Sequence, residues 1–158
     1  MQEKEQKGFT LIEMLIVMGI IAVLAGIVLI AVNPGRQFKQ AHDTQRESNI
    51  NAILNAVGQN IAENKGVFTC LTGSLPTEDT VMAKTGGYDI RPCITPLYIS
   101  EIPVDPTTGS NTCQDAQAGD CAASGAYDTK YMVEPDGGSG RVTVSAMGEI
   151  KNSISITR

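Results

Sequence analysis

A single carboxylate lies inside a long apolar run near the start of the chain. The stretch KGFTLIEMLIVMGIIAVLAG opens with a lysine and a glycine, Gly8, and turns apolar at Phe9. From Phe9 to Val32 the polar side chains are those of Thr10 and Glu13. A carboxylate at mid-depth in a bilayer costs about 2.5–3.5 kcal/mol and usually has a partner. Glu13 is therefore a candidate for pairing with a cation.

The apolar run is long enough to cross a membrane as a helix. At about 1.5 Å per residue, a helix over residues 9–32 reaches roughly 36 Å, against a hydrocarbon core of about 30 Å. A cleaved secretory signal has a shorter apolar region followed by a small-residue cleavage site, and the sequence shows neither. An ordinary single-span anchor fits the length and leaves Glu13 without a partner.

The stretch KGFTLIEMLIV resembles the leader and mature N-terminus of bacterial type IV pilins and type II secretion pseudopilins. In that family a prepilin peptidase cuts after the glycine, on the cytoplasmic side, and methylates the new amino terminus. The resemblance implies a leader over residues 1–8, cleavage between Gly8 and Phe9, and N-methylation of Phe9. It also implies that Glu13 matches the family's glutamate and that residues 9–32 form a transmembrane helix segment.

Cleavage would give Phe9 a positively charged amine about one helical turn from Glu13. The amine of a neighbouring subunit can reach the same carboxylate. At ~4 Å and an effective dielectric near 20, such a pair contributes about 4 kcal/mol before desolvation is subtracted. This energy can offset the burial of the carboxylate when subunits stack, so Glu13 is predicted to be an assembly contact.

A second, amphipathic helix segment is expected over residues 33–66. Pro34 lacks a backbone donor and disfavours helical geometry at Asn33, which predicts a kink or a short break; Asn33 could instead cap a new helix. Gly66 is a candidate C-cap. An apolar stripe has helical spacing: Ile50, Ile53, Leu54, Val57 and Ile61. The side opposite this stripe is predicted to carry Gln45, Arg46, Asn49, Asn55 and Gln59.

Residues 67–158 are expected to form a globular head whose first part, 67–129, is rich in loops. The four cysteines form no CxxC, which argues against a zinc ribbon or a redox pair. An even count beyond a membrane segment suggests disulfides made outside the cytoplasm. Of the three possible pairings we favour Cys70–Cys93 with Cys113–Cys121; four separate buried thiols are the alternative.

Another stretch of the head, YISEIPVDPTTG, resembles a segment of major pseudopilins that precedes a characteristic loop. The aromatic pattern that follows this segment in those proteins is missing here. The subfamily therefore stays open.

Residues 130–158 contain short alternating runs rich in β-branched residues: KYMVE, GRVTVSA and NSISITR. They predict a three-stranded antiparallel meander whose apolar face, including Val142, Val144, Ile154 and Ile156, covers the helix stripe. The expected fold class is α+β. A long N-terminal helix, half transmembrane and half amphipathic, packs against a small C-terminal antiparallel β-meander, and disulfides staple the loops.

No catalytic arrangement stands out, so an enzyme is not expected. His42 is the sole histidine, and the sequence contains no P-loop, GxGxxG or HExxH. A formal net charge of −5 argues against nucleic acid as a partner. Asp105, Asp115 and Asp120 are weak candidates for a calcium site, but their spacing matches no EF-hand, and solvated loop acids are the alternative. No other cofactor is expected.

These features predict the structural subunit of a type IV pilus-like filament, processed by prepilin peptidase and polymerised through its N-terminal helix. The expected partners are identical or related subunits, the peptidase, and an inner-membrane assembly platform with a separate motor ATPase. Before assembly the subunit would be a single-pass protein of the inner (cytoplasmic) membrane with its head outside the cytoplasm. Afterwards it would belong to a cell-surface or periplasmic filament. A type II secretion pseudopilin is the first alternative, and a membrane-anchored binding module is the second.

Overall fold

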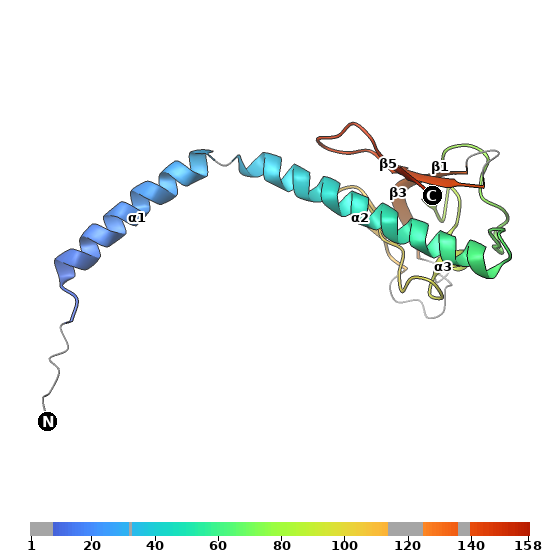
Figure 1. Cartoon of the computed structure of the whole chain (residues 1–158), viewed down its shortest axis with the longest axis horizontal. Helices are drawn as coiled ribbons and strands as arrows, with labels where there is room; N and C mark the ends of the chain where they lie inside the picture. The colour runs from blue at the N-terminus through green and yellow to red at the C-terminus, as the bar shows by residue number, and fades with distance from the viewer. Residues whose placement is uncertain (1–7, 32, 114–124, 136–139) are drawn as a thin grey trace, which may run out of the picture. The chain divides into compact units, whose positions relative to one another are not determined.

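The computed structural model describes residues 8–31, 33–113, 125–135 and 140–158. The chain divides into two units, Met1–Phe38 and Lys39–Arg158. The first unit contains helix α1 and the first turns of helix α2, and the second contains the rest of α2 and the whole sheet (Figure 1).

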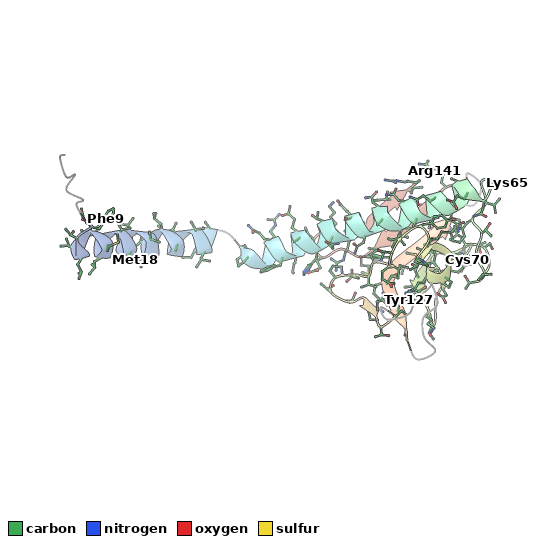
Figure 2. All side chains as sticks on the ribbon, turned by 90° about the horizontal axis from the view of Figure 1, so that it is seen from below. Phe9, Met18, Lys65, Cys70, Tyr127 and Arg141 are labelled. Atoms are coloured by element: carbon green, nitrogen blue, oxygen red, sulfur yellow. A yellow bond between two sulfur atoms is a disulfide. The ribbon has the colours of Figure 1, made fainter. Side chains whose placement is uncertain are left out.

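Helix α1, Leu11–Ala31, is apolar around its whole circumference. None of its residues is buried, and Figure 2 shows side chains such as that of Met18 projecting from the ribbon into open space. It is the one described helix that is long and apolar enough to cross a membrane. An apolar helix that its own chain leaves uncovered needs lipid or other polypeptide around it.

Helix α2, Pro34–Glu63, begins directly after the non-helical Asn33. The Asn33 side chain caps it, because Asn33 Oδ1 accepts the Arg36 backbone N–H at 3.2 Å. Pro34 is the first helical residue, where a missing backbone donor costs nothing. At the other end, Lys65 and Gly66 take positive φ values of 58° and 90°, and the Gly66 N–H donates to Ile61 O at 2.9 Å, which closes the helix.

The sheet contains the predicted meander and two further short strands. Strands β3 (Tyr127–Pro135), β4 (Val142–Ala146) and β5 (Ile154–Thr157) pair antiparallel in sequence order. Strand β1 (Thr80–Ala83) adds to the other edge of β3, and β2 (Ser110–Asn111) also pairs with β3. A short helix, α3 (Arg91–Ile94), lies between β1 and β2 in the chain. The α+β fold class is confirmed.

The core lies between α2 and one face of the sheet. The apolar stripe of α2 is buried at Ile50, Ile53, Leu54 and Val57, and Ile61 is partly buried. Alternate residues of the strands face it, with Tyr131, Val133, Val142 and Val144 at 4 % exposure or less. Alternation along each strand places these side chains on one face, as the meander predicts.

The prediction for the polar side of α2 was partly wrong. Gln45, Asn55 and Gln59 are exposed, but Arg46 and Asn49 are buried at 2 % and 7 % exposure. Both lie on the same side of the helix as the apolar stripe, because positions three and four apart share a helix face. Each is buried with partners: Asn49 Nδ2 donates to Val104 O at 3.1 Å and to the Tyr131 hydroxyl at 2.9 Å.

Candidate functional site

Gly8 and Phe9 precede α1 and are fully open to the surroundings. Phe9 is 81 % exposed, and a Cβ added at Gly8 would meet no atom within 4 Å. The fold therefore does not require glycine at this position. A requirement for glycine would have to come from a partner, such as a protease that binds the chain here.

Thr10 and Glu13 form a reciprocal hydrogen-bonded cap at the start of α1. Thr10 donates to Glu13 Oε2 from its backbone N–H and from its hydroxyl, at 2.8 Å each. In return the Glu13 backbone N–H donates to Thr10 Oγ1 at 3.3 Å. This is the capping-box arrangement, in which a Thr and a Glu three residues later satisfy two free backbone donors.

The cap holds the Glu13 carboxylate at the start of α1. Oε1 has no hydrogen-bond partner among the residues that the structure describes. The free oxygen can accept a cation while Oε2 keeps its bonds to Thr10. The arrangement can therefore bind an amine without breaking the cap.

The described residues thus leave α1 uncovered, and its capped carboxylate lies five positions after the exposed Gly8. Residues 4–29 match the family model described as the prokaryotic N-terminal methylation motif. The chain thus carries the prepilin-type cleavage and methylation signal of type IV pilins and pseudopilins. Comparisons of the chain with curated proteins and with solved structures give no match.

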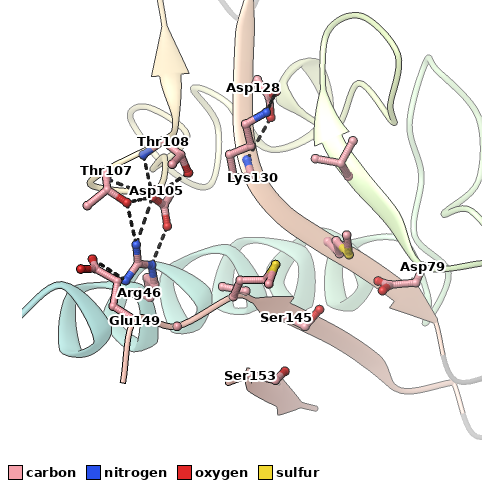
Figure 3. A pocket seen from close by; sticks show the side chains of 15 residues that line it. Arg46, Asp79, Asp105, Thr107, Thr108, Asp128, Lys130, Ser145, Glu149 and Ser153 are labelled. Atoms are coloured by element: carbon pink, nitrogen blue, oxygen red, sulfur yellow. Dashed lines mark hydrogen bonds and ion pairs between the residues drawn. The ribbon is translucent and has the colours of Figure 1, made fainter. Parts of the chain in front are cut away.

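A second group of polar residues fixes the head to α2. We call it the Arg46 cluster: Asp43, Arg46, Asp105, Thr107 and Glu149. Figure 3 shows the Arg46 guanidinium between Asp105, Thr107 and Glu149. Arg46 Nε donates to Asp105 Oδ2 at 2.6 Å, Nη2 donates to Thr107 Oγ1 at 2.8 Å, and Nη1 donates to Asp43 Oδ1 at 2.9 Å and to Glu149 Oε1 at 3.2 Å.

Asp43 holds the loop between β4 and β5. Its Oδ1 accepts the Glu149 N–H at 2.8 Å, and Oδ2 accepts the N–H groups of Ile150 and Lys151 at 2.9 and 3.1 Å. The loop approaches so closely at Gly148 that a Cβ there would collide with the Lys151 carbonyl oxygen. Burial alone would raise the pKa of Asp43, but these three N–H groups and Arg46 outweigh it and lower the pKa to about 2.

Asp105 belongs to the same cluster from the loop before β2. Its Oδ1 accepts the backbone N–H groups of Thr107 and Thr108 at 2.9 and 2.8 Å, and also both hydroxyls. Burial would raise the pKa of Asp105, but Arg46 and the two N–H groups outweigh it and lower that pKa below its ordinary value. Of the three calcium candidates, Asp105 is thus engaged within the head, and Asp115 and Asp120 lie outside the described residues.

The sequence does carry a signal for this cluster. Asp43, Arg46 and Asn49 recur at three-residue spacing and continue the line of Ile50 and Ile53 toward the start of α2. If hydrophobicity alone defines the stripe, its first residue is Ile50, and the buried polar residues before it are missed. A charged residue in line with an apolar stripe indicates a buried charge that needs a partner.

Cys70 and Cys93 form a disulfide, as the sequential pairing predicts. Asn60 on α2 secures this loop, since Nδ2 donates to Thr69 O at 3.0 Å and to Cys93 O at 3.1 Å, and Oδ1 accepts the Thr69 N–H at 2.9 Å. Figure 2 shows Cys70 on the globular unit. Cys113 is also disulfide-bonded. Cys121, its predicted partner, lies outside the described residues.

Proposed function

We propose that this chain is the structural subunit of a type IV pilus-like filament. Prepilin peptidase cuts between Gly8 and Phe9 and methylates Phe9. Before assembly the mature chain lies in the inner membrane with its head outside the cytoplasm. An assembly platform driven by a separate motor ATPase then moves it into the filament. The chain acts as a building unit and catalyses no reaction of its own.

The observation that carries this proposal is the exposure of α1 together with the capped carboxylate of Glu13. A helix that is apolar on every side fits equally well in lipid and among copies of itself. The free oxygen of Glu13 would receive the amine of a neighbouring Phe9. This pairing would distinguish an ordered filament from a non-specific aggregate of apolar helices.

A type II secretion pseudopilin is the second candidate, and the loop around Asp105 favours it. This loop is the end of the stretch YISEIPVDPTTG, which resembles major pseudopilins. The two candidates share processing, membrane insertion and polymerisation. They differ in whether filaments reach the cell surface in wild-type cells.

Glu13→Gln tests the proposal. The amide is isosteric but uncharged, so insertion and cleavage should persist while polymerisation fails, because the amine loses its opposite charge. We would compare cell-associated subunit with sheared surface filaments by immunoblotting, and confirm by mass spectrometry that subunits start at N-methyl-Phe9. Glu78→Gln, which removes an exposed carboxylate in the head, is the matched control and should assemble normally. Abundant filaments of processed Glu13→Gln subunits would contradict the role of Glu13.

A further inference from the structure

The first turns of α2 present an aromatic ring that its own chain does not cover. Every residue from Pro34 to Ala41 is exposed. Phe38 is 66 % exposed, and of the seven Phe and Tyr residues it shares this exposure with Phe9 alone. The cations Arg36 and Lys39 flank it in the sequence. We call Arg36, Phe38 and Lys39 the basic aromatic turn.

Neither cation of the basic aromatic turn is engaged within the described part of the chain. The ion pairs found there involve neither Arg36 nor Lys39. Arg36 faces about 160° away from Phe38 on the helix, whereas Lys39 is the next residue, about 100° around it. An exposed ring beside a lysine that has no ion pair among the described residues indicates a contact with another molecule.

The open face of the sheet contains a pocket of about 640 Å³. Its apolar lining comes from Val81, Met132, Ala146 and Met147, and the two methionines are 39 % and 79 % exposed. Methionine thioethers contact aromatic rings favourably and adapt to the shape of an inserted side chain. The lining contains no aromatic residue, so the pocket suits an aromatic group supplied from outside.

The pocket is acidic. Four carboxylates line it against two cations. Asp105 and Glu149 are bound to Arg46, and Asp128 is paired with Lys130 at 2.6 Å. Asp79 is exposed and has no partner among the described residues, and Figure 3 shows it on the opposite side of the view from Arg46. The pocket therefore keeps an uncompensated negative charge at Asp79.

We propose that this pocket receives Phe38 of a second copy of the chain, with Lys39 of that copy beside Asp79. The Phe38 ring would contact the two methionines of the pocket. The positive charge of Lys39 is opposite to the negative charge of Asp79. The two surfaces differ, so the contact is heterologous. A heterologous contact repeats from copy to copy, and it builds an open helical filament when the rotation between copies does not close into a ring. The inference rests on the proposed function, because it names a contact between filament subunits.

Cross-linking tests the contact directly. Ala41→Cys combined with Ser145→Cys leaves Phe38, Lys39 and both methionines in place, because Ala41 is exposed on the same side of the helix as Phe38 and Ser145 lines the pocket. This variant should give ladders of covalent multimers when intact membranes and sheared filaments are treated with a short bismaleimide. Gln40→Cys with Ser145→Cys is the matched control, because residue 40 is also exposed but faces about 160° away from residue 38 on the helix. Equal cross-linking of the control, or filaments that give no ladder with Ala41→Cys, would overturn the inference and leave the filament itself in place.

Charge exchange provides the second measurement. Lys39→Glu and Asp79→Lys should each lower the yield of sheared filament about tenfold, and the double variant should recover most of it. If the basic aromatic turn instead lies on lipid headgroups, the two changes act independently and the double variant does not recover. Absence of wild-type filaments would reject the proposed function, and the membrane cross-links would then decide the contact on their own.

Discussion

At the level of single side chains, the buried cation of Arg46 depends on several partners within the head. Its guanidinium is buried and contacts three carboxylates from three separate parts of the chain: Asp43 on α2, Asp105 before β2, and Glu149 after β4. Removing one partner from a buried charge network is costly because the remaining charges stay out of water. Arg46 also joins elements that are more than fifty residues apart in the sequence.

Arg46→Met should destabilise the head by about 3–5 kcal/mol, because Asp43 and Asp105 would remain buried without their cation. Urea unfolding of the full chain in detergent, followed by circular dichroism, measures this loss. Gln59→Met introduces the same side chain at an exposed position of α2 and should change the free energy of unfolding by less than about 0.5 kcal/mol. Equal stability of the two variants would show that the cluster contributes little.

Acid should weaken the attachment of the β4–β5 loop to α2. The pKa of Asp43 falls from an ordinary value of 3.8 to about 2 in the folded head, and the pKa of Asp105 is lowered too. Because the folded values lie below the unfolded ones, this stabilisation is complete above about pH 4 and is lost as the pH falls toward 2. Urea unfolding at a series of pH values from 7 to 2 would show the loss.

Asp43→Asn is the control for this pH dependence. The variant should be less stable than the wild type at pH 7, and the difference should shrink as the pH falls below 4. An unchanged difference across the whole range would rule out Asp43 as a source of the acid sensitivity.

At the level of elements, α2 shows which features could be predicted from the sequence and which could not. Periodicity predicted the apolar stripe correctly at Ile50, Ile53, Leu54 and Val57, since burial of apolar residues is what that pattern reports. It placed Arg46 and Asn49 on the wrong side, because hydrophobicity does not register a polar residue that is buried with a partner. The partners of Arg46 on other elements, Asp105 and Glu149, lie far along the chain, and their proximity follows from the tertiary fold alone.

The strands show the same division. The alternating runs over β3, β4 and β5 predicted the meander. Strand β1 has the same length as β5, but its sequence TVMA does not alternate between apolar and polar residues, and β2 has only two residues. They exist because β3 offers backbone partners along its other edge, as in the pairing of Thr80 with Val133. At the N-terminus the sequence was sufficient to recognise the methylation motif, because the motif is one continuous stretch and the family model matches it over residues 4–29. The roles of Gly8, Phe9 and Glu13 stay predictions.

At the level of the whole molecule, the disulfide links the loop after α2 to α3. Cys70 and Cys93 are 23 positions apart in the sequence, and the segment between them includes all of β1. Asn60 then fastens the bridged loop to α2 through the Cys93 carbonyl. The head therefore combines a modest core with covalent closure, as small disulfide-bonded domains often do.

Replacing Cys70 and Cys93 with serine should lower the free energy of unfolding by about 3 kcal/mol, mainly because the unfolded chain regains the freedom of the open loop. The comparison is urea unfolding of the full chain in detergent, oxidised and reduced. Reductant should cost the wild type more stability than it costs the double variant. Thiol alkylation of the native wild type without reductant should label no cysteine, and labelling of Cys70 or Cys93 would contradict the disulfide.

The bareness of α1 also determines which forces can drive polymerisation. The surroundings of α1 are apolar both in the bilayer and in a bundle of like helices. The hydrophobic effect therefore contributes little to the free-energy difference between these two states. What remains to favour the bundle is close van der Waals fit and the electrostatic pairing at its amino-terminal end. In the proposed filament, addition and loss of subunits would then lie near thermodynamic balance, and the proposed motor ATPase would need to supply only a small free energy per subunit.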